Sequence, residues 1–474
     1  MSNSTFELDK LIDIKLSFVF LKMNKETVSQ LLSSFELEPT NFNFIVQLIK
    51  HARESSKPRL AYILGKGILS IVSLSSGITI DLTSLYYELS VSCFYMNKIH
   101  EGSMISDRLI YDRNVPSHLK QTVHSNLTWY LERLDWDSCF PVPVNAPMMF
   151  EDGSSGERWN SGFQTPNSGV QGNPKDSLER WRPLNPGIFR LQDKLIINCR
   201  CVNYNQVGTS YTSCHLDGKI RTRNFLIECD TNFNPIKQIE VVDQFKNGNF
   251  PKWIEGHEDC RFVPSGDGKE LLFSAVTFHL TLEYLPQIAV SKISTEKVFE
   301  AFKEMGETKV PIESTQLIRG PNPGRCEKNW LPFVREGELH FVYLYDPFVI
   351  IKPTSSSIEV VEVEPSKFDF SRFRGSAAPI EFDDGYLLIV HEVIFNSKGE
   401  RTYVHRFLWF NNDLTLSGLK VSPVWYLKEP GIEFCSGMLM MDRTIYIGAG
   451  LKDKEAWIFK IGVEKVREML KEVE

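Results

Sequence analysis

The spacing of apolar residues in the first part of this chain follows the period of amphipathic helices. Apolar residues recur there every three or four positions, as on one face of a helix. Ser117 follows a proline and is a candidate helix N-cap. The run Tyr86–Tyr95 followed by Ile99–Ser103 resembles a tetratricopeptide helical hairpin, although a plain helical cap on the next domain would share this pattern. We therefore predict an all-α, tetratricopeptide-like N-terminal domain over residues 1–140. The expected helical stretches are Leu8–Leu21, Val28–Leu37, Phe44–Ile49, Leu85–Asn97 and Ser117–Leu131.

The period changes after a stretch rich in glycine, proline and polar residues at 141–180, which we interpret as a linker or long surface loop. From Trp181 onward, short apolar runs alternate with polar or glycine-containing turns, which predicts β-hairpins. The hairpins recur at intervals of roughly 50–75 residues. They are expected at Ile188–Asn198, Phe262–Phe273, Pro332–Tyr343, Pro379–Val390 and Met438–Gly448.

A radial β repeat explains this recurrence, so residues 181–474 are predicted to form a five-bladed β-propeller. A β-sandwich is the competing all-β architecture, but it gives no reason for the repeat. A short amphipathic helix is expected at Val463–Val473. The fold class is thus mainly β, with a helical domain in front.

The composition of the chain indicates which kinds of binding partner are not expected. The chain of 474 residues is 42% hydrophobic and 24% charged, which is typical of soluble globular proteins. Its net charge of -7 argues against a nucleic acid or an anionic membrane surface as partner. No apolar run approaches the roughly 18 residues that a membrane helix needs, and the N-terminus lacks the pattern of a signal peptide.

The cysteines indicate a reduced protein. Their number, nine, is odd, and no two have the C-x-x-C spacing, so neither a disulfide framework nor a zinc site is expected. Cys199 and Cys201 should share one face of a strand, with Arg200 on the opposite face. His215, His257 and His405 have no metal-ligand spacing. We expect a cytoplasmic protein without a metal or cofactor.

One polar stretch, Trp253–Phe262, holds the most reactive set of side chains. Glu258 and Asp259 form a carboxylate pair just before a predicted strand, and Arg261 follows two positions after Asp259. Residues two apart share a strand face, so Arg261 could hold the carboxylate of Asp259. The alternative is an ion pair that only stabilises a loop.

Similar polar clusters flank the other hairpins, where a propeller lines its central cleft. Together they would place Asp259, Glu433 and Asp453 among several cations. These cations are Arg200, Lys328, Arg372 and His391. Carboxylates surrounded by cations suit sugar chemistry, because an acid can transfer a proton while cations hold a phosphate or another leaving group. His391 as a core histidine, and Arg372 and Arg374 as surface charges, are the alternatives.

The order of these motifs resembles glycoside hydrolase family 130 over roughly Trp181–Val466. The motifs are Asn185-Pro, Arg200, Glu258-Asp-x-Arg261, Lys328-Asn329, His391, Glu433 and Asp453. The family consists of five-bladed propellers, mostly inverting β-mannoside phosphorylases. The chain is also similar to the glycosyltransferase family 108 mannosyltransferases.

The resemblance implies a role for each matching residue. Asp259 would be the general acid and would relay its proton through a sugar hydroxyl. Residues expected to bind the donor sugar are Asn185, Arg200, Glu433 and Asp453, with Glu258 and Arg261 also placed among the substrate-binding residues. Residues expected around the phosphate or leaving group are Lys328, Asn329, Arg372, His391 and Tyr403.

The chain departs from the family at Tyr345-Asp346-Pro347, where the phosphorylases tend to have His-Arg-Pro. An aspartate there repels phosphate, so a sugar phosphate or nucleotide-sugar donor with an oligosaccharide acceptor competes with inorganic phosphate. A β-mannoside hydrolase is a further alternative. A non-catalytic binding propeller, whose helical domain docks a protein partner, is an alternative of a different class.

Overall fold

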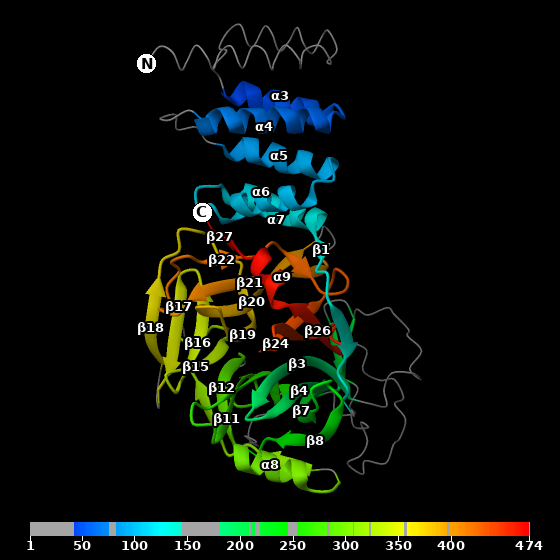
Figure 1. The fold of residues 1–474 in the computed structure, drawn as a ribbon, viewed down its shortest axis with the longest axis vertical. Helices are drawn as coiled ribbons and strands as arrows, with labels where there is room; N and C mark the ends of the chain where they lie inside the picture. The colour runs from blue at the N-terminus through cyan, green and yellow to red at the C-terminus, as the bar shows by residue number, and fades with distance from the viewer. Residues whose placement is uncertain are drawn as a thin grey trace, which may run out of the picture. The chain divides into compact units, whose positions relative to one another are not determined.

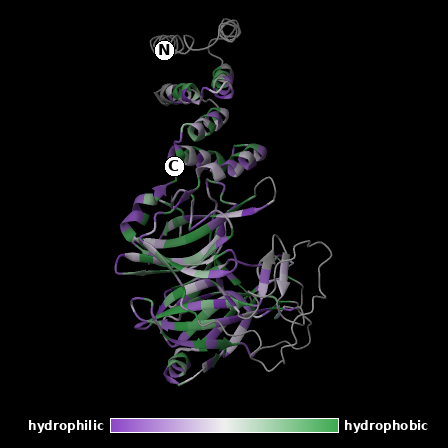
Figure 2. Ribbon diagram, turned by 90° about the vertical axis from the view of Figure 1, so that its right-hand side faces the viewer, coloured by the Kyte–Doolittle hydropathy of each residue, from purple (hydrophilic) through white to green (hydrophobic). Residues whose placement is uncertain are grey.

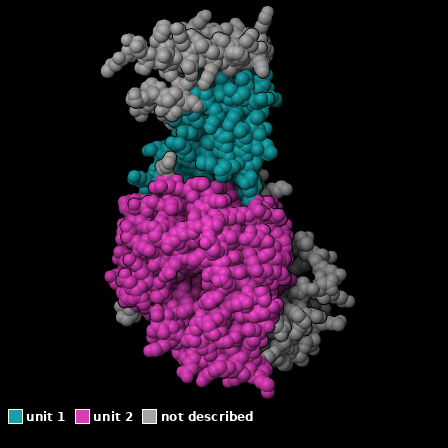
Figure 3. All heavy atoms as spheres, viewed as in Figure 1, with its two compact units in different colours: residues 1–132, 367–369 teal, residues 133–366, 370–474 magenta. Residues whose placement is uncertain are grey.

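The chain divides into two compact units, shown in different colours in Figure 3. The computed structural model describes residues 42–74, 82–144, 181–207, 210–213, 219–244, 254–281, 285–306, 308–321, 324–354, 358–395 and 399–473. Unit 1 comprises residues 1–132 with 367–369, and unit 2 comprises residues 133–366 with 370–474. The helices predicted at Leu8–Leu21 and Val28–Leu37, and most of the predicted linker, lie outside the described residues.

Unit 1 is helical, as predicted for this part of the chain. Its described helices are α3 (Phe42–Glu54), α4 (Pro58–Leu74), α5 (Thr83–Tyr95), α6 (Ile99–Tyr111) and α7 (Ser117–Asn126), followed by the 3-10 helix η1 (Leu127–Tyr130). Each helix packs against the next one in sequence, and Leu48, Ile49, Ala61 and Leu85 are buried in the core. Pro116, not Ser117, is the N-cap of α7, and no side chain caps this helix.

The repeat in unit 1 is longer than a tetratricopeptide repeat. α3 and α5 begin at Phe42 and Thr83, and α4 and α6 begin at Pro58 and Ile99, so both helices of the pair recur after 41 residues. Tetratricopeptide repeats recur after about 34 residues. The tetratricopeptide resemblance is therefore not confirmed.

A short segment from far along the chain, residues 367–369, belongs to unit 1. The Nζ of Lys120 lies 2.6 Å from Oδ2 of Asp369, and Nη2 of Arg113 donates to the carbonyl oxygen of Phe368 across 2.8 Å. The backbone N–H of Asp369 donates to the carbonyl oxygen of Tyr111. These contacts hold the segment to α6 and α7.

Unit 2 is built from β-sheets (Figure 1). The first contains β3 (Arg182–Leu191), β4 (Lys194–Val202), β7 (Ile220–Cys229), β8 (Pro235–Val242), β13 (Thr308–Pro311) and β9 (Ile254–Glu255). The second contains β10 (His257–Pro264), β11 (Glu270–Thr277), β12 (Gln287–Ser294) and β14 (Ser314–Ile318). The third contains β15 (Leu331–Arg335), β16 (Glu338–Tyr345), β17 (Phe348–Pro353) and β18 (Ile358–Glu364).

Two further large sheets complete the unit. One contains β19 (Arg374–Phe382), β20 (Gly385–Phe395), β21 (Arg401–Asn411), β22 (Lys420–Val421), β23 (Trp425–Tyr426), β27 (Lys471–Glu472) and β1 (Glu132–Arg133). The other contains β24 (Glu433–Met441), β25 (Thr444–Leu451), β26 (Glu455–Gly462) and β2 (Ser138–Pro141). A separate small hairpin joins β5 (Tyr204–Val207) and β6 (Ser210–Ser213).

All the predicted hairpins are confirmed as antiparallel strand pairs. They correspond to β3–β4, β10–β11, β15–β16, β19–β20 and β24–β25. The first strand of each large sheet contacts the first strand of the next, in the order β3, β10, β15, β19, β24 and back to β3. Unit 2 is therefore a mainly β, propeller-type arrangement with these strands innermost.

Apolar side chains explain why the sheets stack. Figure 2 shows hydrophobic residues concentrated along the strands and hydrophilic residues in many of the turns. One buried cluster joins the β3–β4 sheet to the β10–β11 sheet through Phe189, Phe262 and Phe273, whose neighbouring rings are stacked. Cys199 and Cys201 are both fully buried, and Arg200 between them is 4% exposed.

The chain enters unit 2 before residue 140, which was the predicted end of the helical domain. β2 pairs antiparallel with β26 and supplies the fourth strand of that sheet. Phe140 on β2 packs against Phe233, with ring centroids 5.3 Å apart. Unit 2 accordingly starts at Arg133.

Two helices accompany the sheets. α8 (Thr295–Lys303), which the hydrophobic pattern did not predict, begins after Ser294, whose hydroxyl accepts a hydrogen bond from the backbone N–H of Lys297. α9 (Val463–Met469) is the predicted C-terminal helix and is shorter than expected. No described helix is both long and apolar enough to cross a membrane. The eight cysteines in the described part of the chain are free thiols.

The β2–β26 pairing makes a prediction about truncated chains. A chain beginning at Arg133 should keep unit 2 folded, whereas one beginning at residue 143 should lose the β2 ladder and the packing of Phe140. Burying a phenylalanine side chain is worth about 1.5–3 kcal/mol, so the shorter chain should have a clearly lower Tm. Thermal unfolding of the two chains checks this, and equal Tm values would contradict it.

Candidate active site

The inner strands of unit 2 break their regular pairing where the predicted polar residues lie. The register shifts between Leu184 and Gly187 on β3 and between Glu258 and Arg261 on β10. Asn185 and Asp259, inside these bulges, have φ of 47° and 49°. Left-handed backbone at residues with side chains is costly and is concentrated at functional sites. A bulge re-aims a side chain, so both residues leave the alternation of their strands.

A glycine on the neighbouring sheet makes room for this arrangement. A Cβ at Gly450 of β25 would lie 2.0 Å from Oδ1 of Asn185 and 2.9 Å from its backbone nitrogen. Only the absence of a side chain at Gly450 therefore allows β3 and β25 to approach this closely. The position of Asn185 depends on this contact.

Arg200 connects the two predicted acids. Its Nη1 donates to Oδ1 of Asp259 across 2.9 Å, and its Nη2 donates to Oε1 of Glu258 across 2.8 Å. Asn185 Nδ2 also donates to Oδ1 of Asp259, across 2.8 Å. The side chain of Arg200 is 5% exposed, whereas those of Glu258 and Asp259 are 26% and 21% exposed. Four residues from three of the predicted motifs thus form one cluster, open to solvent on the side of the acids.

The two carboxyl groups have pKa values shifted in opposite directions. Burial alone would raise the pKa of Asp259, but the charges of Arg200 and Arg261 and the hydrogen bond from Asn185 lower it overall. Burial raises the pKa of Glu258, with only partial opposition from Arg200. A general acid must hold a proton, so the lowered pKa of Asp259, which Arg200 binds directly, disfavours the role that the resemblance implies.

Asp453 belongs to the same electrostatic cluster. Burial raises the pKa of Asp453, Arg200 opposes this, and the charge of Asp259 adds to it. Arg401 also acts on Asp453 and was not identified from the sequence. Thr222 was missed as well, although its hydroxyl accepts a hydrogen bond from Nε of Arg200 across 3.3 Å. Neither residue stands in a motif, so only proximity identifies them.

The strand alternation predicted that Arg261 holds the carboxylate of Asp259, but the structure shows that it does not. Its Nη1 donates to the backbone carbonyl oxygen of Asp259, and its Nε donates to the carbonyl oxygen of Ser376 across 3.0 Å. The bulge between Glu258 and Arg261 is the reason, because it turns the two side chains away from a common face. Arg261 therefore links β10 to β19.

His391 is buried beside Ser376. Its Nδ1 lies 2.8 Å from Oγ of Ser376, and its ring stacks on that of Tyr403 at 5.4 Å. Burial lowers the pKa of His391, and nearby cations lower it further, so the imidazole is neutral at neutral pH. Ser376 is fully buried. The hydroxyl of Ser376 is consequently out of reach of a substrate carbonyl, and a serine nucleophile has no support.

Three other cations, Lys328, Arg372 and Arg374, come from the starts of the third and fourth sheets. Lys328 is exposed and opposes the rise in the pKa of Glu258, and Arg374 acts on the buried Tyr345 together with Arg261. Asn329 has φ of 63° just before β15. Arg372 is half-buried in the turn that precedes β19. Tyr345, from the segment that departs from the family, was not identified as a site residue.

Glu433 is engaged by the backbone. Its carboxylate accepts hydrogen bonds from the N–H groups of Leu427, Lys428 and Glu429, at 2.6, 2.8 and 3.0 Å. The residue is 1% exposed, and burial raises its pKa although the three amides oppose this. Both oxygens are thus occupied in holding a loop, and the predicted contact with a sugar has no support here.

Two histidines and an aspartate approach one another near the acids. Asp243, His257 and His279 each have a potential ligand atom within 4.8 Å of the others. However, the backbone N–H of Gly256 donates to Nδ1 of His279, so Nε2 carries the proton and faces Oδ2 of Asp243 at 2.8 Å. A metal on Nε2 would require a proton on Nδ1, which already faces a donor. The cluster fits hydrogen bonding better than metal ligation.

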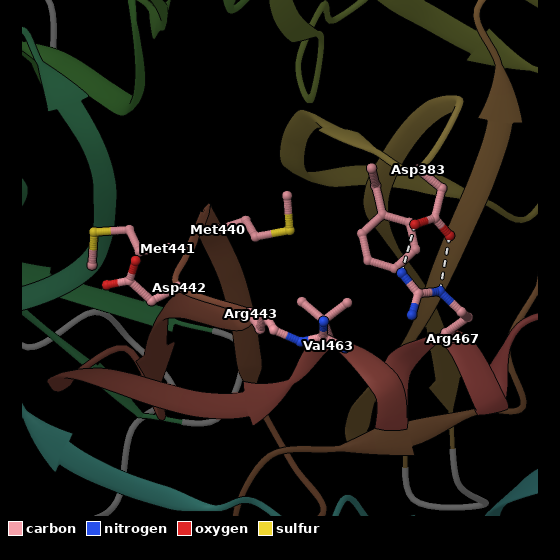
Figure 4. A pocket seen from close by; sticks show the side chains of 8 residues that line it. Asp383, Met440, Met441, Asp442, Arg443, Val463 and Arg467 are labelled. Atoms are coloured by element: carbon pink, nitrogen blue, oxygen red, sulfur yellow. Dashed lines mark hydrogen bonds and ion pairs between the residues drawn. The ribbon is translucent and has the colours of Figure 1, made fainter.

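A separate pocket of about 320 Å³ lies at the turns of β19–β20 and β24–β25 beside α9 (Figure 4). Arg467 of α9 donates to both carboxylate oxygens of Asp383 at this pocket. None of the predicted site residues lines it. On the face of unit 2 seen in Figure 3, the surface is instead hollowed near its middle, where the inner strands meet.

The chain is similar to known proteins in its three-dimensional structure, but not detectably in its sequence. No protein-family model matches the chain, and no curated protein has a detectably similar sequence. Among solved structures, the chain is similar to a β-1,2-mannobiose phosphorylase from Listeria innocua. Identity is 13%, with coverage of 63% of this chain and 94% of that chain, and the TM-score is 0.37.

Two structures from Leishmania mexicana are similar to the same extent. One is a mannose phosphorylase in complex with phosphate ion, with 12% identity, coverage of 61% and 87%, and a TM-score of 0.36. The other is a GDP-Man-dependent mannosyltransferase, with 12% identity, coverage of 60% and 86%, and a TM-score of 0.37. At these TM-scores the likeness does not define a reaction for this chain.

We expect the removal of Arg200 from its cluster to have a large effect on the stability of the protein. Arg200→Met should lower the free energy of unfolding by roughly 3 kcal/mol, because it leaves two partly buried carboxylates without their shared cation. Arg223→Met is the matched control. Arg223 forms a two-point ion pair with Glu240 and is itself 26% exposed, so its loss should cost about 1 kcal/mol or less. Denaturant unfolding of both variants checks the difference.

The pH dependence of that effect has a definite sign. A carboxyl group whose pKa is lowered by folding stabilises the protein above its ordinary pKa, here 3.8, and this contribution is lost as the pH falls through the lower value. The stability difference between the wild type and Arg200→Met should be largest at neutral pH and shrink as the pH falls and the two carboxylates become protonated. A difference that is constant down to acid unfolding would contradict the pairing.

Glu433→Gln tests the structural role of that carboxylate. The amide would turn a donor group toward backbone N–H groups, so unfolding free energy should fall by about 1–3 kcal/mol. Sugar affinity of the folded variant should change little. A variant of normal stability that no longer binds sugar would restore the sugar-binding role.

Proposed function

We propose that this chain is a carbohydrate-active enzyme that transfers a mannosyl-type residue with inversion, as a glycosyltransferase or glycoside phosphorylase of the β-mannoside type. The observation that carries the proposal is the Glu258–Asp259 pair on one buried guanidinium, with the charge of Lys328 also acting on Glu258. We further propose that the five large sheets are five blades, which the closed order of contacts between their inner strands supports.

The sugar would bind on the side of the acids. Asn185, Arg200, Asp259 and Asp453 offer both donors and acceptors, which is what a ligand with many hydroxyl groups requires. Asn185 and Asp259 are fixed by their bulges, so these groups are preorganised. Glu258 completes this set and is the most exposed of the carboxylates bound to Arg200.

The leaving group would bind on the side of the cations. Nη2 of Arg261 and the hydroxyl of Tyr345 are buried donors with no hydrogen-bond partner among the described residues. Burial raises the pKa of Tyr345, so its hydroxyl keeps the proton that it would donate. Arg374 and Lys328 add positive charge. Donors without acceptors beside cations suit the anionic oxygens of a phosphate or diphosphate. Asn329, Arg372, His391 and Tyr403 are proposed to line the same side.

The charge state of Asp259 favours the synthetic direction. In transfer, the acceptor oxygen attacks the anomeric carbon, the bond to the anionic leaving group breaks on the opposite face, and the proton of the acceptor hydroxyl passes to a base. Asp259 is suited to accept that proton, directly or through a sugar hydroxyl, because it is an ionised carboxylate at neutral pH. In phosphorolysis the same residue would have to donate a proton, which its lowered pKa disfavours.

Two alternatives differ in their products. A β-mannoside hydrolase would use water in place of the acceptor, with the same base. A binding propeller would hold sugar without turnover, with unit 1 as a docking module for a protein. The deciding experiment incubates the protein with GDP-mannose or mannose 1-phosphate and simple mannosides. Elongated product supports transfer, free mannose supports hydrolysis, and binding without product supports the non-catalytic alternative.

Asp259→Asn tests the catalytic assignment. The amide keeps the size of the side chain but cannot accept a proton, so turnover should fall by roughly 10²–10⁴-fold while sugar affinity changes far less. Because Arg200 keeps Glu258 as a partner, stability should fall by only about 1–3 kcal/mol.

Glu258→Gln is the matched control for this variant. It removes the neighbouring carboxylate but leaves the proposed base in place, so its turnover should fall by less than about tenfold. Both rates should be measured on folded protein, as judged from the Tm. If Asp259→Asn turns over normally, or if Glu258→Gln is the more damaging change, Asp259 is not the base.

A further inference from the structure

The joint between the first two sheets lies directly before the paired acids. β9 runs beside β7 of the first sheet, and β10 of the second sheet begins at His257, so Gly256 alone forms the joint. Gly256 has φ of 102°, and a Cβ there would lie 2.6 Å from the carbonyl oxygen of Thr222. The joint is tightly packed on this side. Any shift of Gly256 passes along the backbone to Glu258 and Asp259, two and three residues later.

The imidazole of His279 binds the backbone N–H of Gly256, the single residue of this joint. The backbone N–H of Gly256 donates to Nδ1 of His279 across 3.3 Å. Because a backbone N–H can only donate, Nδ1 is the unprotonated nitrogen, and Nε2 donates its proton to Oδ2 of Asp243 across 2.8 Å. His279 is 8% exposed, so water has little access to replace these bonds. The carboxylate thereby fixes the tautomer that the joint requires.

The same joint also supports the other half of the acid cluster. Thr222, whose backbone packs on Gly256, accepts the hydrogen bond from Nε of Arg200. His257, next in the chain, is anchored by its carbonyl oxygen, which accepts a hydrogen bond from Nδ2 of Asn224 across 2.8 Å. Both Arg200 and the bulge that carries Asp259 are therefore attached to elements that meet at Gly256.

We propose that His279 and Asp243 are positioning residues, which hold the Gly256 joint and thereby aim Asp259 at its substrate. The catalytic consequence rests on the proposed function, whereas the positioning itself does not. Neither residue needs to touch the substrate. Their effect is on the geometry of proton transfer, where a displacement of about 1 Å can cost about 10²-fold in rate.

Two substitutions at His279 separate positioning from packing. His279→Asn keeps an acceptor near the position of Nδ1, so the hydrogen bond from Gly256 can form. His279→Phe keeps the ring volume and removes both hydrogen bonds. We expect kcat to fall about 10–100-fold in His279→Phe with KM changed less than about threefold, and His279→Asn to recover most of the loss.

His340→Phe is the matched control. His340 is also a buried histidine, with Nδ1 at 3.0 Å from the carbonyl oxygen of Glu338, but it lies on β16, away from the joint. Its replacement should lower the Tm without changing kcat. If His340→Phe reduces kcat as much as His279→Phe, the effect is general destabilisation and the proposal is wrong.

Hydrogen–deuterium exchange gives a readout that needs no substrate. Exchange of the segment from Gly256 to Arg261 should be faster in His279→Phe than in the wild type and close to wild type in His279→Asn. If the wild type transfers no sugar, the proposed function fails. Hydrogen–deuterium exchange still tests whether His279 positions the Gly256 joint. Unchanged exchange in His279→Phe overturns it. A zinc-dependent rise in the Tm that Asp243→Ala abolishes would also overturn it, because Nε2 would then bind metal.

Discussion

The candidate site depends on one buried guanidinium. Arg200 rises from β4 of the first sheet, and the two carboxylates that it binds come from β10 of the second. A buried charge costs several kcal/mol unless it is paired and hydrogen-bonded, and three groups bind this one: Glu258, Asp259 and Thr222. The ion pair thus fixes the relation between two neighbouring sheets at the point where the chemistry is proposed.

Local strain places the groups around Arg200. In regular strands the side chains of Asn185 and Asp259 would each follow the alternation between the two faces of their sheet. Regular pairing would also keep both strands straight. The bulges break this alternation, and the left-handed φ of both residues is sustained by the surrounding contacts. Gly450 and Gly256 allow the neighbouring backbones to come close enough for those contacts. The same rigidity that costs free energy preorganises the acids.

The charges around the site are divided. Asn185, Arg200 and the carboxylates are one set of groups, and Arg261, Lys328, Arg374 and the Tyr345 hydroxyl are the other. Burial raises the pKa of Glu258, whereas Arg200, Arg261 and Asn185 lower that of Asp259, although the two acids are adjacent in sequence. Environments that push two pKa values apart divide the protonation states between the groups. An ionised Asp259 facing donors for an anionic leaving group is the physical basis for preferring transfer.

The sequence by itself determined the helical first part, all five hairpins, and the cluster of Asn185, Arg200, Glu258 and Asp259. Periodicity is a local property, and polar motifs that follow a repeat lie at equivalent places in each repeat. Only the tertiary structure placed β2 in the last sheet, turned Arg261 toward Ser376, engaged Glu433 with three amides, and brought Asp243 and His279 to Gly256. Those outcomes depend on a bulge, on a strand pairing between residues more than 300 positions apart, and on side chains meeting across loops. The electrostatic balance at Asp259 was likewise decided by distances, because charge interactions fall with separation in space and not along the chain.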